Sequence, residues 1–198
     1  KWEKAVFAKG SRTQILLITD REVPLYREIY GTEPERFHLL PPNIDRRTFS
    51  ESDRESARLA KLAELGLAAD TTLLLMVGSG FRTKGVDRAI EGLAKLQSTE
   101  SNKTQLVVVG HGKPDSYQRL ARSLGVGDRL HMLGGRADVP EWMLAADLLI
   151  HPARNENTGT VLLEALANGL PLLVSDVCGY AFHIERANAG RLVPSPFS

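Results

Sequence analysis

The segment from Ile150 to Tyr180, with the apolar residues that lead into it, constrains the fold of this chain more than any other stretch. It predicts a strand at 147–150, a polar loop at 151–157, a helix at 161–168 and a second strand at 172–174. Gly169 follows the predicted helix, where a glycine commonly ends a helix. Pro171, which cannot continue a helix, precedes the second strand. This order is typical of folds in which parallel strands alternate with covering helices.

Two glutamates, Glu156 and Glu164, lie eight positions apart across the start of this helix. At ~1.5 Å rise per residue their backbones lie ~12 Å apart, roughly the span from a ribose to a sugar across a diphosphate. The amides of residues 158–160 lie between them, at a helix N-terminus that attracts anions. The pattern predicts a nucleotide-diphosphate-sugar site. The alternative to such a site is that both glutamates are solvated surface residues. The apolar neighbours of Glu164 argue against this alternative.

Alternating elements extend on both sides of this unit. Strands are predicted at 14–19, 37–40, 72–77, 105–109, 129–133 and near 191–193, and helices at 23–30, 51–65, 85–97, 114–124, 138–146 and 179–187. The alternation predicts an α/β fold with a doubly wound, Rossmann-like parallel sheet. Residues 1–13 show no clear pattern. Pro41 and Pro42 cannot continue a strand ladder, so a domain boundary or a plain connecting turn is expected there.

Composition excludes several classes of site. The net charge of +1 gives no reason to expect a nucleic-acid partner. The single cysteine excludes an internal disulfide, and the five histidines lack metal-ligand spacing, so no metal is expected. No apolar run approaches the ~20 residues of a membrane-spanning helix. The chain lacks an initial Met and ends in Pro-Ser-Pro-Phe-Ser198, so we expect it to be a fragment.

The motifs together resemble those of the retaining GT-B glycosyltransferases of family GT4. The resemblance rests on Glu156-x7-Glu164 followed by Ala165, Gly169, Pro171 and Ser175-Asp176, and on GSGFRTKGVDRAIE at 78–91, LVVVGHGKP at 106–114, GGRADVPEWMLAADLLIHPARNENTGTVLLEA at 134–165 and VCGYAFHIERANAG at 177–190. It covers nearly all the chain. Within the family, the wider match is to the glucosyltransferases that build the lipopolysaccharide core.

The resemblance implies a domain organisation and a reaction. Residues 51–198 would be the C-terminal, donor-binding half of a GT-B enzyme, truncated at its end, after a hinge at 41–50. Residues 1–40 would be the last β-α-β piece of the N-terminal acceptor domain. The implied reaction moves glucose from UDP-glucose to a heptose of the inner core with retention, and the fragment alone is expected to be inactive. The implied location is the cytoplasmic face of the bacterial inner membrane, with peripheral membrane contact of the whole protein.

The resemblance also implies roles for site residues. Glu164 would bind the ribose, Lys84 and the amides of 158–160 the diphosphate, and Glu156 the sugar hydroxyls. Lys84 and Glu156 are therefore the candidate catalytic residues, and neither a metal nor another cofactor is expected because the lysine and the helix dipole supply positive charge. The full predicted donor site comprises Gly78, Gly80, Lys84, Arg136, Glu156, Asn157, Thr158, Gly159, Thr160 and Glu164.

Several alternatives remain open. The family pairs an arginine with the lysine, whereas Thr83 precedes Lys84 here and the arginine is Arg82. A shift of one residue at a helix start turns a side chain by ~100°, so whether Arg82 replaces the family's arginine stays open. Gly78 and Gly80 could form a plain turn, and Arg136 could pair with a nearby aspartate at the surface. The rival functions are a GT4 transferase with another hexose or hexosamine donor and a non-catalytic flavodoxin-like binding module.

Overall fold

The structure, a computed structural model, describes residues 2–40, 42–44, 48–96 and 103–196. It divides the chain into two compact units, Lys1–Ile44 and Asp45–Ser198. Parts of the predicted hinge, Pro41 and residues 45–47, lie outside the described residues, as does the last residue of the predicted helix 85–97. The assignment of residues 1–40 to an acceptor domain stays a prediction.

The first unit is a small β-α-β arrangement. Its elements are α1 (Trp2–Phe7), β1 (Ile15–Leu17), α2 (Val23–Tyr30), the 3-10 helix η1 (Pro34–Arg36) and β2 (Phe37–Leu39). β1 and β2 pair in parallel. Helix α1 was not predicted, since the sequence shows no pattern there. A helix this short depends on tertiary contacts. Phe7 stacks on Tyr26 at 4.1 Å between ring centroids, and buried Arg36 donates a hydrogen bond to the carbonyl of Ala8.

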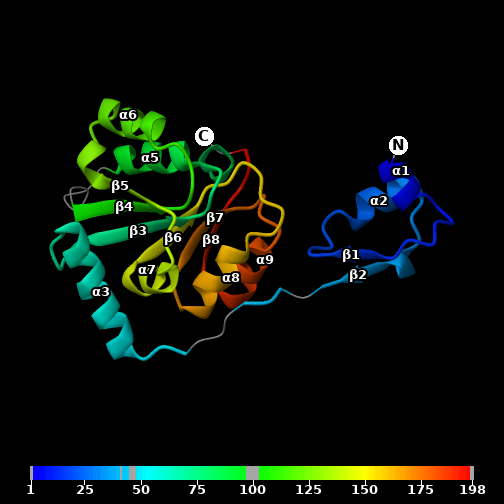
Figure 1. Ribbon diagram of the computed structural model, residues 1–198, viewed down its shortest axis with the longest axis horizontal. Coiled ribbons are helices and arrows are strands. Elements are labelled where there is room, and N and C mark those ends of the chain that lie inside the picture. The colour runs from blue at the N-terminus through cyan, green and yellow to red at the C-terminus, as the bar shows by residue number, and fades with distance from the viewer. Residues whose placement is uncertain (1, 41, 45–47, 97–102, 197–198) are drawn as a thin grey trace. The chain divides into compact units, whose positions relative to one another are not determined.

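Among its described residues, the second unit forms a six-stranded sheet in the order β5-β4-β3-β6-β7-β8 (Figure 1). Every neighbouring pair is parallel. The strands are β3 (Thr72–Val77), β4 (Thr104–Val109), β5 (Leu130–Gly134), β6 (Leu148–His151), β7 (Leu172–Ser175) and β8 (Gly190–Val193). The doubly wound parallel sheet predicted from the alternation is confirmed. Strand β4 is buried along its whole length, as expected where helices cover both faces.

Helices cover both faces of this sheet, α5 and α6 on one side and α7, α8 and α9 on the other (Figure 1). The helices are α3 (Glu51–Leu65), α4 (Phe81–Lys84), α5 (Val86–Lys95), α6 (Asp115–Ser123), η3 (Gly127–Arg129), α7 (Val139–Ala145), α8 (Thr160–Ala167) and α9 (Ala181–Ala187). Alternate residues of β3 divide between the layers. Leu73 and Leu75 belong to the core under α7–α9, and Met76 belongs to the core under α5 and α6. The short helix α4 was not predicted.

The strand order places a topological switch point between β3 and β6. From β3 the chain winds outward through β4 to β5, and it then returns to the other side of β3 as β6. Open α/β sheets bind ligands beyond the carboxyl ends of the strands at such a point, because the connecting helices leave it in opposite directions. The segments that follow β3 and β6 begin at Gly78 and Pro152. They carry the predicted lysine, at the end of α4, and the first glutamate.

Candidate functional site

The loop after β3 brings Lys84 over the end of the sheet. The N–H of Gly78 donates to the carbonyl of Val109 at 2.8 Å, which joins this loop to the end of β4. A Cβ atom at position 78 would lie 3.2 Å from Lys84 Cε, so the glycine leaves room for the lysine side chain. Gly80, with φ of 76°, precedes α4, and Lys84 is the last residue of that helix.

The loop after β6 is fixed to the start of α5. Gly85 has φ of 74°, and a Cβ atom there would overlap the carbonyl oxygen of Pro152. The Arg154 guanidinium forms two hydrogen bonds of 2.7 Å with the carboxylate of Asp87, and the Arg154 N–H donates to the carbonyl of Thr83 at 2.8 Å. These contacts join two loops that are distant in sequence. No sequence pattern points to Arg154, because its partners become neighbours only when β3 and β6 pair.

Glu156 is the centre of a three-residue polar cluster with Lys84 and His151. Its Oε2 atom accepts from Lys84 Nζ in an ion pair and from His151 Nε2 at 3.2 Å. The Glu156 side chain is 12% exposed. Burial raises the pKa of Glu156, but the hydrogen bonds from His151 and Lys84 and the charge of Lys84 outweigh it and hold the pKa at about 2. Glu156 is therefore a carboxylate at neutral pH and accepts hydrogen bonds only.

The structure brings the two candidate catalytic residues together, and it adds His151. The predicted loop 151–157 is wrong at its first residue, because His151 is the last residue of β6 and is fully buried. Its backbone continues the pairing with β7, which the apolar run alone did not reveal. A histidine five positions before Glu156 at a predicted strand end was the available signal.

The segment from Glu156 to Gly159 leads into helix α8. Gly159 precedes the helix with φ of 81°, so the helix begins at Thr160, one residue earlier than predicted. Thr158 is held by the N–H of Tyr180, which donates to its carbonyl at 2.8 Å. Of the residues that the structure describes, none accepts a hydrogen bond from the amides of Thr158, Gly159 or Thr160. These amides are the positive end of the helix dipole.

Glu164 lies one turn further along α8 and is half-buried. Burial raises the pKa of its carboxyl group. Within the described parts of the chain, no hydrogen bond or ion pair satisfies this carboxylate. A half-buried acid without a partner on a largely apolar helix is unusual for a purely structural position. Its predicted contact with a ribose stays a prediction.

Arg136 is engaged in a separate ionic network. It contacts Asp138 at 2.8 Å and Glu64 at 2.9 Å, and Asp138 also pairs with Lys61. The surface pairing considered above as the alternative is therefore present. In the described residues no hydrogen bond or ion pair links Arg136 to the Lys84–His151–Glu156 cluster, and its donor-binding role stays a prediction. Arg82 is exposed, and its carbonyl accepts from Arg154 at 3.0 Å.

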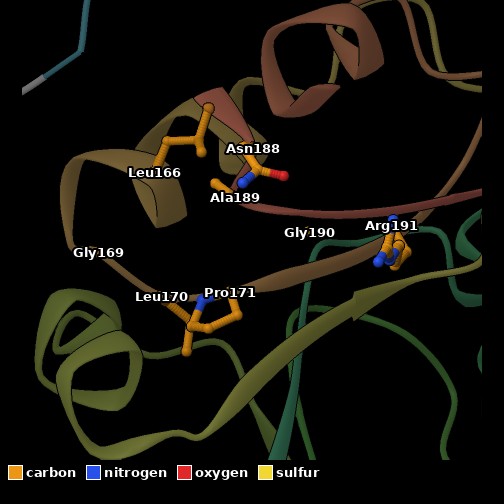
Figure 2. Close-up of a pocket in the computed structure, with 8 residues that line it drawn as sticks. All are labelled: Leu166, Gly169, Leu170, Pro171, Asn188, Ala189, Gly190 and Arg191. Atoms are coloured by element: carbon orange, nitrogen blue, oxygen red, sulfur yellow. The ribbon is translucent and has the colours of Figure 1, made fainter. Parts of the chain in front are cut away.

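A cavity of about 370 Å³ lies at the opposite edge of the sheet, where the chain enters β7 and β8 (Figure 2). It is lined by Leu166, Gly169, Leu170, Pro171, Asn188, Ala189, Gly190 and Arg191. None of the predicted donor-site residues lines it. The described residues contain no group of three or more His, Cys, Asp or Glu side chains placed to hold a metal ion. In the same part of the chain, every helix is too short or too polar to cross a membrane.

The chain shares its sequence with known glycosyltransferases. The lipopolysaccharide glucosyltransferase WaaG of Escherichia coli K12 is 46% identical over 198 residues, which are 100% of this chain and 53% of WaaG. A D-inositol 3-phosphate glycosyltransferase of Jonesia denitrificans is 30% identical over 185 residues, which cover 89% of this chain and 44% of that protein. The chain thus spans about half the length of these relatives.

Solved structures show the same fold. A crystal structure of WaaG, described as a glycosyltransferase involved in lipopolysaccharide biosynthesis, matches with a TM-score of 0.91 and 45% identity, over 100% of this chain and 53% of that one. Anabaena Alr3699/HepE in complex with UDP and glucose matches with a TM-score of 0.76 at 21% identity, over 93% and 50% of the two chains, and supports the fold alone. The family model "Glycosyl transferases group 1" matches residues 58–198. The resemblance is confirmed: this chain is a homologue of WaaG and belongs to the group 1 glycosyl transferases.

Proposed function

We propose that this chain is the donor-binding half of a retaining lipopolysaccharide glucosyltransferase, which transfers glucose from UDP-glucose to a heptose of the inner core. The observation that carries the proposal is the meeting of Lys84 and Glu156 at the switch point of the sheet. The two residues are 72 positions apart in the sequence, and each follows a different strand of the sheet. Membership of the glycosyl transferases favours this function over a non-catalytic binding module.

In this proposal the donor lies along the start of α8. The ribose hydroxyls donate to Glu164, whose carboxylate has no described protein partner. The diphosphate oxygens accept hydrogen bonds from the amides of residues 158–160, where the helix dipole favours negative charge. The glucose hydroxyls donate to Glu156, which is ionised and therefore only accepts. The donor is thus held at both ends of its diphosphate, and Glu156 orients the anomeric carbon through the sugar hydroxyls.

Lys84 supplies charge to the leaving group. Departure of UDP builds negative charge on the β-phosphate, and a fixed cation in a site shielded from water stabilises that charge. Lys84 Nζ already contacts Glu156, so a bound diphosphate shares this lysine with the carboxylate or takes it over. In the resembling enzymes the leaving phosphate itself serves as the base, so no side-chain nucleophile is required. We propose that no metal takes part, because the lysine and helix amides provide the charge.

The rest of the proposal concerns the whole protein. The heptose acceptor would bind an N-terminal domain, so residues 1–198 alone would transfer almost no sugar. The reaction would take place at the cytoplasmic face of the inner membrane, which the whole protein would contact peripherally. These assignments are supported by homology to WaaG, whose name states its action on lipopolysaccharide.

The proposal is tested by calorimetric titration of the folded chain with UDP, UDP-glucose, UDP-galactose and UDP-N-acetylglucosamine. We expect UDP to bind, and UDP-glucose to bind more tightly than the other UDP-sugars. Glu164→Ala should weaken UDP roughly ten- to a hundredfold, because a carboxylate that holds hydroxyls contributes ~1.5–3 kcal/mol and ~1.4 kcal/mol is tenfold. Glu185→Ala, at an exposed position of α9, is the matched control and should bind UDP normally. A folded chain that binds no uridine nucleotide would refute the proposal.

A further inference from the structure

The imidazole of His151 is a buried polar group that has none of the donor-binding roles proposed above. It is fully buried at the end of β6, beside the core formed under α7–α9. Ser175 helps to fix this strand end, since its Oγ donates to the carbonyl of Ala153 at 2.8 Å. A buried polar ring is costly unless it forms hydrogen bonds, and the described bond of this ring runs from Nε2 to Glu156. An apolar side chain would fill this position at a lower cost in desolvation free energy.

The direction of this hydrogen bond follows from the chemistry of the two groups. Glu156 is ionised and has no proton to give, so His151 Nε2 carries the hydrogen and donates it. His151 Nδ1 is buried, and among the described residues it has no hydrogen-bond partner. In the neutral ring this nitrogen is the one without a proton. His151 is therefore a fixed donor aimed at one oxygen atom.

Both donors to Glu156 converge on the same oxygen. Lys84 Nζ and His151 Nε2 both contact Oε2, and within the described residues no hydrogen bond or ion pair involves Oε1. Two donors on one oxygen fix the rotation of the carboxylate about its last bond. The second oxygen then keeps its lone pairs for another ligand.

We infer that His151 is a positioning residue, which holds Oε2 of Glu156 so that Oε1 accepts hydrogen bonds from the sugar of the donor. The inference rests on the proposed function, because it assumes that Glu156 binds the sugar. His151 itself does not touch the substrate. It acts by limiting the carboxylate to one orientation, which lowers the entropic cost of binding the sugar hydroxyls.

Lys84 cannot fill this role by itself. Its ammonium lies at the end of a flexible four-carbon stem, and the proposed function requires its charge at the diphosphate. Once the diphosphate draws Lys84 away from Oε2, His151 is the remaining described donor to that oxygen. The imidazole cannot follow, because it is buried at the end of a paired strand. The histidine therefore matters most when the donor is bound.

The test compares His151→Met with His151→Gln. The two replacements are similar in size and uncharged, but only glutamine carries an amide N–H near the place of Nε2. We expect His151→Met to weaken UDP-glucose about tenfold while UDP affinity is unchanged, since a hydrogen bond to a charged group is lost only where the sugar binds. His151→Gln should retain most of the UDP-glucose affinity. Thermal melts establish that both variants are folded.

Several results would overturn the inference. Wild-type affinity of His151→Met for UDP-glucose would show that the donor is not needed. An equal loss of UDP and UDP-glucose would show a merely structural role, as would a His151→Gln variant as weak as His151→Met. A wild-type chain that binds neither ligand would refute the proposed function and this inference with it. If His151→Met does not fold, nitrogen NMR of the wild-type imidazole decides: a proton on Nε2 supports the inference, and a bare Nε2 refutes it.

Discussion

Replacement of Gly85 by alanine should disturb both the stability of the second unit and its site. Gly85 joins α4 to α5 in a left-handed conformation, with φ of 74°. An added Cβ would overlap the backbone carbonyl of Pro152, which is itself held by the Arg88 guanidinium at 3.1 Å. The backbone on one side must therefore move, and this shifts the loop that carries Lys84 against the loop that carries Glu156.

Gly66 provides a matched control for this substitution. It has φ of 66° at the end of α3, and no atom lies within 4 Å of a Cβ built there. The left-handed conformation costs an alanine ~1–2 kcal/mol at either position. Overlap with a backbone atom adds roughly 1–3 kcal/mol for Gly85→Ala alone. The difference between the two variants therefore isolates the contact between the loops.

The assay is thermal unfolding, followed by titration with UDP-glucose. We expect Gly66→Ala to lower Tm by roughly 3–6 °C and Gly85→Ala by about twice as much, given ~2–4 °C per kcal/mol for a unit of this size. Only Gly85→Ala should weaken UDP-glucose binding, because a displaced Lys84–Glu156 pair no longer fits the donor. Equal losses of stability and unchanged affinity in both variants would refute the view that Gly85 sets the spacing of the two loops.

Three further predictions concern the polar cluster and the donor. The pKa of Glu156 falls from 4.5 to about 2 on folding, so its contribution is present above pH 4.5 and is lost as the pH falls toward 2. Urea denaturation at pH 6 and pH 2 measures the stability that wild type has relative to Glu156→Gln. This relative stability should be ~3 kcal/mol smaller at pH 2 than at pH 6. A relative stability that does not change with pH would contradict the low pKa of Glu156. Glu156→Ala should leave UDP affinity nearly intact but weaken UDP-glucose, and calorimetry showing equal loss of both would reverse the proposed orientation of the donor. EDTA or added magnesium should leave UDP affinity unchanged, and a tenfold loss on chelation would reveal a metal requirement.

The sequence by itself determined the class of fold and the order of its elements. Helix 51–65 and strand 72–77 occur at the predicted residues, because the signals that delimit them are local. Ser50 caps the helix in a reciprocal pair with Asp53, and Gly66 ends it. The apolar runs of the parallel strands are equally local, since a strand covered on both faces requires them whatever its neighbours are. Glu156 could also be selected from the sequence pattern, because it follows a predicted strand and precedes a helix, whereas Lys84 was selected through the family resemblance.

Only the tertiary structure decided how these residues combine. Lys84 and Glu156 are 72 positions apart, and Arg154 and Asp87 are 67 apart, so no local pattern encodes either contact. Helix α1 likewise contacts a residue that is distant in sequence, since its Phe7 stacks on Tyr26. The sequence predicts His151 as the first residue of a loop, whereas in the structure it pairs with β7 and is buried. The strand order supplies the physical reason: β3 and β6 become neighbours only after the chain has formed two intervening strands, and that adjacency creates the Lys84–His151–Glu156 cluster.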